Sequence, residues 1–167
     1  MSDHDHEGFG KAACDHANNP RNRGRLDIFN GHSRITGPCG DVMEFWIYVD
    51  NGIIKKVSFE TSGCGSSLAC GSIASILAEG RQLEKAAAMD KREILDALGG
   101  LPPEMRHCAM LAAVTLKIAC LDYSDSKKED VDIQQQVDKE LHESEEWRQA
   151  ERKYRFIKLG QLKSKKV

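Results

Sequence analysis

Three cysteines, one aspartate and one histidine stand at places in the sequence where side chains can do chemistry. Cys39 lies in GPCGD, Cys64 lies in TSGCGSS, and Cys108 ends LPPEMRHC directly after His107. Glycines beside the first two cysteines let the backbone approach a ligand closely and leave amide N–H groups facing it. Asp41 follows Cys39 by two residues. Three thiolates with an imidazole or a carboxylate suit zinc or an iron-sulfur cluster, whereas magnesium and calcium prefer oxygen ligands.

A predicted β-hairpin brings two of these cysteines together. Apolar and polar residues alternate along two runs, and Asn51-Gly52 joins the runs with a dipeptide that readily accepts a type I′ turn. The residues predicted to face the core are Met43, Phe45, Ile47 and Val49 in the first strand and Ile53, Val57 and Phe59 in the second. Because the strands are antiparallel, Cys39 and Cys64 converge at the open end of the hairpin, within reach of Asp41.

Helical periodicity and turn signals account for most of the remaining residues up to Tyr123. The predicted helices span 9–18, 66–80, 83–88, 91–98 and 103–123. In the second helix, the predicted buried stripe consists of Ala69, Ile73, Ile76 and Leu77. The cysteines and histidine interpreted as ordinary helix or core residues are Cys14, His16, Cys70 and Cys120.

Cys108 and His107 occupy the first turns of the last predicted helix. The helix macrodipole and the neighbouring Arg106 are expected to raise the thiolate fraction of Cys108. Adjacent residues on a helix point about 100° apart, so this pair does not predict a nucleophile with its base. Two ligands that flank a shared metal fit the spacing better. No CxxC pair is present, so the residues alone leave zinc and an iron-sulfur cluster as alternatives.

Length and composition exclude several classes of protein. A chain of 167 residues with 40% hydrophobic content holds one ordinary domain, and a net charge of −2 provides no basic surface for nucleic acid. No apolar run is long enough for a membrane span, and MSDHDHEGFG lacks the features of a signal peptide. We therefore expect a cytoplasmic protein whose six cysteines are thiols or metal ligands.

The motifs NPRNRG, GPCGDVM, SGCGSS and LPPEMRHC occur in the order and approximate spacing of one known family. Over residues 9–123 the chain resembles the IscU/NifU-type iron-sulfur cluster assembly scaffolds. The resemblance implies an α+β fold in which helices pack on one side of a small three-stranded antiparallel sheet. It also implies that Cys39, Cys64 and Cys108 bind the cluster, that Asp41 makes the cluster labile, and that His107 can serve as the fourth ligand.

The same resemblance implies a scaffold rather than an enzyme, with a set of partners. A cysteine desulfurase delivers persulfide sulfur to the scaffold thiols, iron and electrons arrive, and a [2Fe-2S] cluster is built and passed to acceptor apoproteins. Frataxin-like and ferredoxin proteins belong to the implied partners, and Cys108 is the predicted persulfide acceptor. The family's chaperone-recognition segment is commonly LPPVK, whereas this chain has LPPEM with Met105 at the lysine's place. This departure argues against docking to a DnaK-like chaperone.

Three other interpretations use the same residues. In a SufU-like sulfurtransferase, the set holds zinc and exchanges one thiolate for an incoming persulfide, but that branch typically lacks the histidine found here as His107. A cysteine-dependent hydrolase using Cys108 and His107 lacks a third group that orients the base. A structural metal domain does not need the adjoining glycines or a mixed fourth ligand.

The two ends of the chain differ from the central domain. Residues 1–8 are predicted to be a flexible tail, and residues 124–167 a charged helical extension in which about half of the residues carry charge. The apolar residues of this extension are Ile133, Val137, Leu141, Trp147 and Tyr154. We expect them to pack against a second subunit in a homodimer, the alternative being a solvated helix that rests on its own domain. No cysteine follows Cys120, which predicts a stand-alone scaffold.

Overall fold

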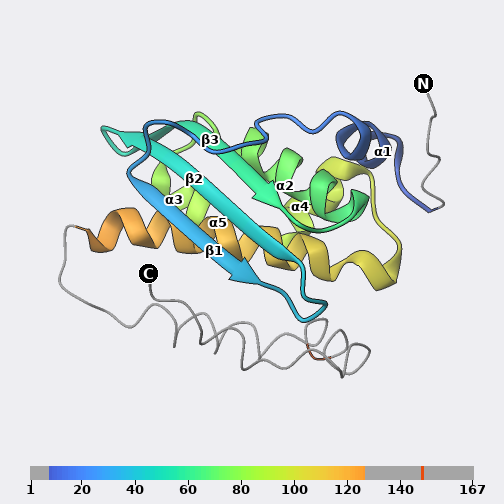
Figure 1. Ribbon diagram of the computed structural model, residues 1–167. Coiled ribbons are helices and arrows are strands. Elements are labelled where there is room, and N and C mark those ends of the chain that lie inside the picture. Colours follow the sequence, from blue (N-terminus) through green and yellow to red (C-terminus); the bar gives the residue numbers. More distant parts are fainter. Residues whose placement is uncertain (1–7, 127–147, 149–167) are drawn as a thin grey trace.

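A computed structural model describes residues 8–126 and Arg148, so residues 1–7 and most of the C-terminal extension lie outside the described residues. The strands are β1 (Gly31–Thr36), β2 (Val42–Asp50) and β3 (Ile53–Thr61), and the helices are α1 (Lys11–Asn18), α2 (Gly65–Ala78), α3 (Leu83–Ala87), α4 (Lys91–Leu98), the 3-10 turn η1 (Pro103–Met105) and α5 (His107–Asp125). The strands form one antiparallel sheet in the order β1-β2-β3, and Figure 1 shows the helices behind it. The predicted α+β fold is confirmed.

The predicted hairpin forms around the predicted turn. Asn51 and Gly52 have φ values of 49° and 74°, the left-handed conformation that a type I′ turn requires at both positions. Phe45 pairs with Phe59 across the two strands, and their ring centroids lie 6.1 Å apart. The four inward residues predicted for the first strand are all buried. The hairpin therefore provides the main face of the core.

A β-bulge changes the phase predicted for the second strand. The register shifts between Tyr48 and Val49, so that Val49 lies opposite Ile54 while Tyr48 lies opposite Lys56. The extra residue in β3 places Ile54 in the core with 0% exposure, whereas Ile53 is only partly buried. The prediction that Ile53 faces the core was wrong. Strict alternation assigns every second residue to the core, whereas the extra residue of a bulge exchanges the two faces beyond it.

The edge strand β1 has almost no apolar signature of its own. Its buried positions are Gly31, Ser33 and Ile35, and Ser33 Oγ donates a hydrogen bond to the Thr115 carbonyl of α5. A Cβ at Gly31 would lie 2.6 Å from the carbonyl oxygen of Ala119. Helix α5 thus passes close under β1, at a point where only glycine fits.

Helix α2 lies in the interior rather than on the surface. It contacts α1, α4, α5 and β3, and its buried residues include the serines Ser66, Ser67, Ser72 and Ser75. Ile76, predicted to lie on the buried stripe, is instead 42% exposed. An enclosed helix buries most of its circumference, so a search for one apolar stripe selects the wrong residues.

The last described helix differs from its prediction at both ends. Pro103–Met105 forms a separate 3-10 turn, and α5 begins at His107 and continues to Asp125, two residues past the predicted end. Among the described residues, no helix is long and apolar enough to cross a membrane. The chemical consequence is that His107 and Cys108 occupy the first two positions of α5.

Candidate functional site

The five predicted site residues line one pocket of about 260 Å³. The residues that line this pocket are Cys39, Asp41, Cys64, Ser66, Glu104, Met105, His107 and Cys108. They come from the loop between β1 and β2, from the start of α2, and from η1 with the first turn of α5. The pocket therefore collects residues from three separate regions of the sequence. We refer to it below as the cysteine pocket.

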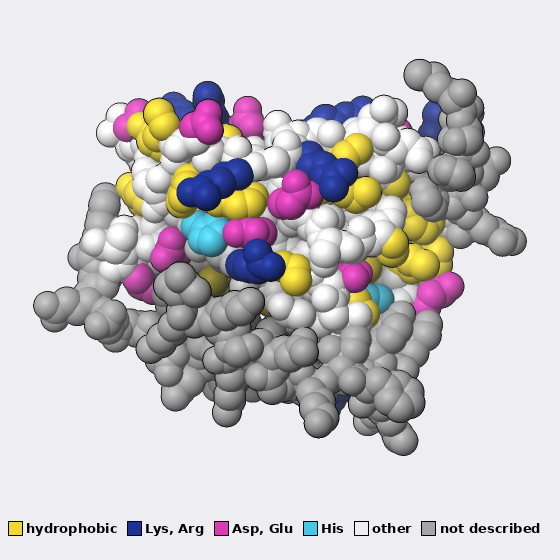
Figure 2. Space-filling view, viewed as in Figure 1, with side chains coloured by type: hydrophobic (Ala, Val, Ile, Leu, Met, Phe, Trp, Pro, Cys, Tyr) yellow, Lys and Arg dark blue, Asp and Glu magenta, His cyan; other side chains and the backbone are white. Residues whose placement is uncertain are grey.

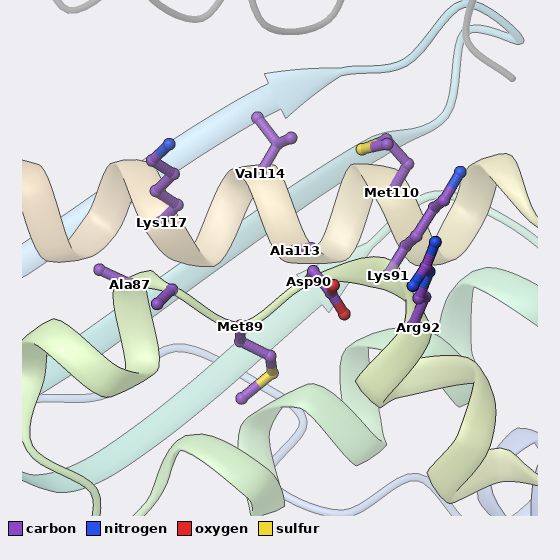
Figure 3. Close-up of a pocket in the computed structure, with 10 residues that line it drawn as sticks. Ala87, Met89, Asp90, Lys91, Arg92, Met110, Ala113, Val114 and Lys117 are labelled. Atoms are coloured by element: carbon purple, nitrogen blue, oxygen red, sulfur yellow. The ribbon is translucent and has the colours of Figure 1, made fainter. Parts of the chain in front are cut away.

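A larger hollow elsewhere has different chemistry. This hollow has a volume of about 300 Å³. Figure 3 shows its lining residues on α5 and on the segment that joins α3 to α4. It is lined by Ala87, Ala88, Met89, Asp90, Lys91, Arg92, Met110, Ala113, Val114 and Lys117. Its described lining contains neither cysteine nor histidine, and Asp90 caps α4 by accepting a hydrogen bond from the Glu93 amide. Its side chains supply neither a thiolate nor an imidazole to bind a metal ion.

Backbone hydrogen bonds shape the loop that carries Cys39 and Asp41. The Gly37 amide donates to the Asp41 carbonyl at 2.7 Å, and the Gly40 amide donates to the Gly37 carbonyl at 3.0 Å. Gly40 has a φ of 86°, in the left-handed region that favours glycine. The glycines of this segment therefore allow a tight turn that holds a thiol and a carboxylate at the rim of the cysteine pocket.

Cys64 is the N-cap residue of α2 and is exposed. At the same end of the hairpin, the Ser62 amide donates to the Val42 carbonyl at 3.1 Å, and Met43 pairs with Thr61. The start of β2 and the end of β3 thus lie side by side, as predicted. Cys39 and Cys64 line the same pocket because the antiparallel hairpin brings the segments that carry them together.

Two serines that the sequence analysis did not single out connect the site residues. Ser66 Oγ lies 3.3 Å from Cys64 Sγ and 3.3 Å from Cys108 Sγ. Ser67 Oγ lies 3.3 Å from Asp41 Oδ2, to which it can donate, and 3.5 Å from Cys108 Sγ. Their position in the sequence could have identified them, because they lie in the first turn of the helix after Cys64, where side chains point back toward the N-terminus.

His107 is held by the turn that precedes it. Its Nδ1 lies 2.9 Å from the Glu104 carbonyl oxygen, and its Nε2 lies 3.7 Å from Cys108 Sγ. Because a carbonyl oxygen only accepts, Nδ1 carries the proton of this hydrogen bond, and Nε2 is the ring nitrogen that faces the thiol. A ring oriented through one nitrogen so that the other can bind a metal is a common arrangement for metal-binding histidines. The two adjacent side chains therefore lie close together, although neighbouring positions on an α-helix point about 100° apart.

The expected lowering of the Cys108 pKa was also wrong. Burial raises the pKa of this thiol, and the nearby Asp41 carboxylate raises it further, although hydrogen bonds with Ser66 and Ser67 act in the opposite direction. Cys108 is only 2% exposed, so the loss of hydration outweighs the benefit of a helix N-terminus. A raised pKa also argues against a hydrolase in which this thiol is activated at neutral pH.

The site residues line the pocket without closing around a single point. Across residues 8–126 and Arg148, no three His, Cys, Asp or Glu side chains are grouped tightly enough to hold a metal ion. Side-chain rotation or movement of the loop that carries Cys39 and Asp41 is therefore needed before all of them can contact one ion.

Two cysteines predicted to be core residues lie in the core. Cys70 is 0% exposed and Cys120 is 1% exposed, which confirms their role as small buried side chains. Burial raises the pKa of Cys70 and raises that of Cys120 to about 12. His16 is also buried, and its Nδ1 lies 2.7 Å from Ser72 Oγ. These three side chains are buried where the helices pack together, and none of them lines the cysteine pocket.

Comparisons with known proteins agree with the family suggested by the motifs. Residues 9–130 match the family model described as the NifU-like N terminal domain. The chain is 41% identical over 120 residues to the iron-sulfur cluster assembly scaffold protein IscU of Haemophilus influenzae, covering 69% of this chain and 94% of that protein. It is 42% identical over 124 residues to IscU of Azotobacter vinelandii, covering 71% of this chain and 96% of that protein.

Solved structures show the same fold at lower sequence identity. A nitrogen-fixing NifU-like protein (N-terminal) from Brucella abortus has a TM-score of 0.56 and 16% identity, covering 70% of this chain and 94% of that chain. An iron-sulfur cluster assembly scaffold protein for the SUF system from Fervidobacterium islandicum has a TM-score of 0.57 and 20% identity, covering 70% and 98%. These two likenesses concern the fold alone.

Proposed function

The chain belongs to the NifU-like N-terminal domain family, and from that premise we propose that it is a scaffold on which a labile iron-sulfur cluster is assembled. The cluster is the cargo of such a protein rather than a resident cofactor. The observation that carries the proposal is the convergence of Cys39, Cys64, Cys108, Asp41 and His107 on one pocket. The similarity to scaffold proteins over about 120 residues supports the same function.

The donor set fits iron and sulfide better than a hard cation. Three thiols supply soft ligands, and His107 Nε2 is oriented toward Cys108 by the hydrogen bond at Nδ1. We propose a [2Fe-2S] cluster, held by the three cysteines together with either Asp41 or His107. Zinc suits the same side chains and is the ion we expect in protein purified without iron.

The pocket also suits a cluster that must leave. Cys64 is exposed, and Cys39 and Asp41 are only partly buried, so water reaches one side of the site. A permanent cluster is better served by four thiolates in a dry pocket, since hydrogen bonding and solvent access around the ligands tune a metal site. An oxygen ligand at Asp41 binds iron less strongly than a thiolate does and can be exchanged.

The partners follow from this role. A cysteine desulfurase supplies persulfide sulfur, for which Cys108 is the proposed final acceptor, and acceptor apoproteins receive the finished cluster. A frataxin-like protein and a ferredoxin are proposed as further partners, and a homodimer as the assembled form. The thiols of the described residues are free, which fits a reducing compartment such as the cytoplasm.

A zinc-bound sulfur acceptor of the SufU type is the second candidate. The same thiols and carboxylate can hold zinc, and the pocket does not by its geometry select one metal. His107 separates the two functions, because it lines the pocket here and the resemblance associates it with the scaffold branch. In the second candidate the protein transfers sulfur and builds no cluster.

Anaerobic purification followed by absorption spectroscopy and analysis of iron, zinc and acid-labile sulfide distinguishes the candidates. Visible sulfide-to-iron charge-transfer bands, with iron and sulfide in equal amounts after incubation with a desulfurase, cysteine, ferrous iron and a dithiol reductant, support the scaffold. Colourless protein that retains one zinc after the same treatment supports the sulfur acceptor. Cys39→Ser, Cys64→Ser and Cys108→Ser should each lower the cluster content, whereas Cys14→Ser on α1 is the matched control and should not.

A further inference from the structure

Ser66 contacts two sulfurs that differ strongly in their access to solvent. Cys64 Sγ and Cys108 Sγ both lie 3.3 Å from Ser66 Oγ. Cys64 is exposed, whereas Cys108 is 2% exposed and Ser66 is 1% exposed. A sulfur donor arriving from solution therefore meets Cys64 first. The buried hydroxyl of Ser66 is therefore within hydrogen-bond reach of both the outer and the inner thiol.

We propose that sulfur enters the cysteine pocket on Cys64 and is then passed inward to Cys108, with Ser66 as the positioning residue for this step. The inference rests on the proposed function, because it concerns the route by which delivered sulfur reaches its acceptor thiol. It deepens that function by dividing the work between two cysteines. Cys64 takes the sulfur, and Cys108 keeps it where the pocket lining shields it.

The transfer is a thiol-persulfide exchange that needs no oxidant or reductant. The Cys108 thiol first loses its proton, which the departing Cys64 sulfur can take up at the end, and the Cys108 sulfur attacks the outer sulfur of the Cys64 persulfide. A bond forms between Cys108 Sγ and that outer sulfur, and the bond between the outer sulfur and Cys64 Sγ breaks. Cys64 leaves as a thiolate and Cys108 carries the persulfide. One sulfur atom moves, and the charge moves from Cys108 to Cys64.

The hydroxyl of Ser66 can serve both ends of this exchange. It can hydrogen-bond to the attacking sulfur before the transfer and to the leaving sulfur after it, because it is within reach of both. Hydrogen bonds to charged groups are about twice as strong as neutral ones. Ser67 differs from Ser66 because its hydroxyl contacts Cys108 and Asp41. Ser66 is thus placed to lower the barrier for transfer between the two thiols.

The test follows single sulfur atoms by mass. The full-length protein, reduced and free of metal, is mixed anaerobically with glutathione persulfide that carries ³⁴S as its outer sulfur. Samples are quenched by alkylation after increasing times, and peptides are mapped by mass spectrometry. In the parent protein, label should appear first on Cys64 and then rise on Cys108 as it falls on Cys64. In Cys108→Ala, the label should remain on Cys64.

Two further variants test the route and the role of the hydroxyl. Cys64→Ser should lower the rate at which Cys108 gains label at least about tenfold. Ser66→Ala should leave the labelling of Cys64 unchanged. It should slow the transfer from Cys64 to Cys108 about tenfold, equivalent to about 1.4 kcal/mol. A general structural defect would affect both steps. Ser75→Ala, on the same helix and outside the pocket lining, is the matched control and should behave as the parent does.

Each outcome decides between the alternatives. If Cys108 gains label in Cys64→Ser as fast as in the parent, the inward route is wrong. If Ser66→Ala passes label on at the parental rate, Ser66 has no positioning role. Reconstitution with ferric iron and inorganic sulfide bypasses the persulfide step, so parent protein and Ser66→Ala should both form the visible chromophore. Its absence from the parent would count against the proposed function, while the mass mapping would still decide the route.

Discussion

Gly71 of α2 lies so close to the ring of Phe59 on β3 that a Cβ at this position would be 2.3 Å from Phe59 Cδ2. Phe59 is fully buried and pairs with Phe45, so the ring has little room to move. The contact fixes how closely α2 approaches the sheet. Since Cys64 and Ser66 lie at the start of the same helix, the approach also positions one side of the cysteine pocket.

Gly71→Ala should therefore destabilise the protein although alanine is the better helix former. Alanine gains up to about 1 kcal/mol of helix propensity, whereas overpacking a core commonly costs about 1–3 kcal/mol, and a ring at this distance cannot yield without moving its neighbours. We expect a net loss of about 1 kcal/mol or more in urea unfolding. Ile76→Ala on the exposed side of α2 is the control, with a change near 0.5 kcal/mol. A stabilised Gly71→Ala would contradict this account of the contact.

The hairpin was predictable because its determinants are local. Asn51-Gly52 specifies the turn, and alternation along 43–49 specifies the inward face, so the juxtaposition of Cys39 and Cys64 followed from the sequence. The bulge was not predictable from alternation, since the position of the extra residue in β3 depends on how Ile54 packs against the rest of the core. A local pattern thus predicted which strands pair, and tertiary packing determined which residues of β3 face the core.

The remaining errors share a physical cause. Strand β1 buries Gly31 and Ser33. Gly31 fits there because α5 passes too close for a Cβ, and Ser33 fits because its hydroxyl donates to the Thr115 carbonyl. The pKa of Cys108 is governed by burial, which position in a helix does not reveal. Ser66 contacts Cys108 only because α2 and α5 pack side by side in the fold. Each depends on a contact between segments far apart in sequence, and the family resemblance supplied the ligand set without these contacts.

The thiol of Cys120 should make stability depend on pH. Burial raises its pKa from 9.0 to about 12 in the folded protein. Its contribution is therefore fully present below pH 9 and is lost as the pH rises toward 12, because the unfolded chain releases the proton first. At pH 10.5 the loss amounts to about 2 kcal/mol, using 1.36 kcal/mol per unit.

Cys120→Ala removes this titration. Urea unfolding of the parent and of Cys120→Ala at pH 8 and pH 10.5 separates it from the titration of lysines and tyrosines, which the two proteins share. We expect the parent to lose about 2 kcal/mol more than the variant between these pH values. Parallel losses in the two proteins would mean that the Cys120 thiol ionises as readily in the folded state as in the unfolded chain.

The C-terminal extension is the subject of a third prediction, because its apolar residues need a partner surface. These residues lie outside the described part of the chain, so the prediction rests on their sequence alone. Burying an apolar side chain contributes about 1.5–3 kcal/mol, so several of them can offset the cost of association. A variant ending at Ser126 keeps α5 whole, since this helix ends at Asp125.

We expect that variant to sediment as a lighter species and to lose its cluster faster in air. The full-length triple variant Ile133→Ser, Val137→Ser, Leu141→Ser is a second test, because it retains the charges of the extension and removes three apolar side chains. Both variants should shift toward monomer if the extension forms the dimer. An unchanged sedimentation profile in both would assign the extension to a solvated role.

Asp41 provides the sharpest test of how the cluster is released. The carboxylate is partly buried, shares a short loop with Cys39, lines the cysteine pocket and lies within hydrogen-bond reach of Ser67 Oγ. Removing a weak oxygen ligand should slow ligand exchange. Asp41→Ala should then pass its cluster to an apo-ferredoxin about tenfold more slowly than the parent, equivalent to about 1.4 kcal/mol in the barrier.

Two further variants separate ligation from charge. Asp41→Asn keeps the shape and an oxygen that can accept from Ser67 while removing the negative charge, and it should also slow transfer because the neutral amide does not replace the carboxylate as an iron ligand. Asp50→Ala removes an exposed carboxylate at the far end of β2 and should transfer as the parent does. Visible circular dichroism during transfer gives the rates. If Asp41→Ala releases its cluster as fast as Asp50→Ala, the carboxylate is not the ligand that makes the cluster labile, and His107 Nε2 becomes the group to test next.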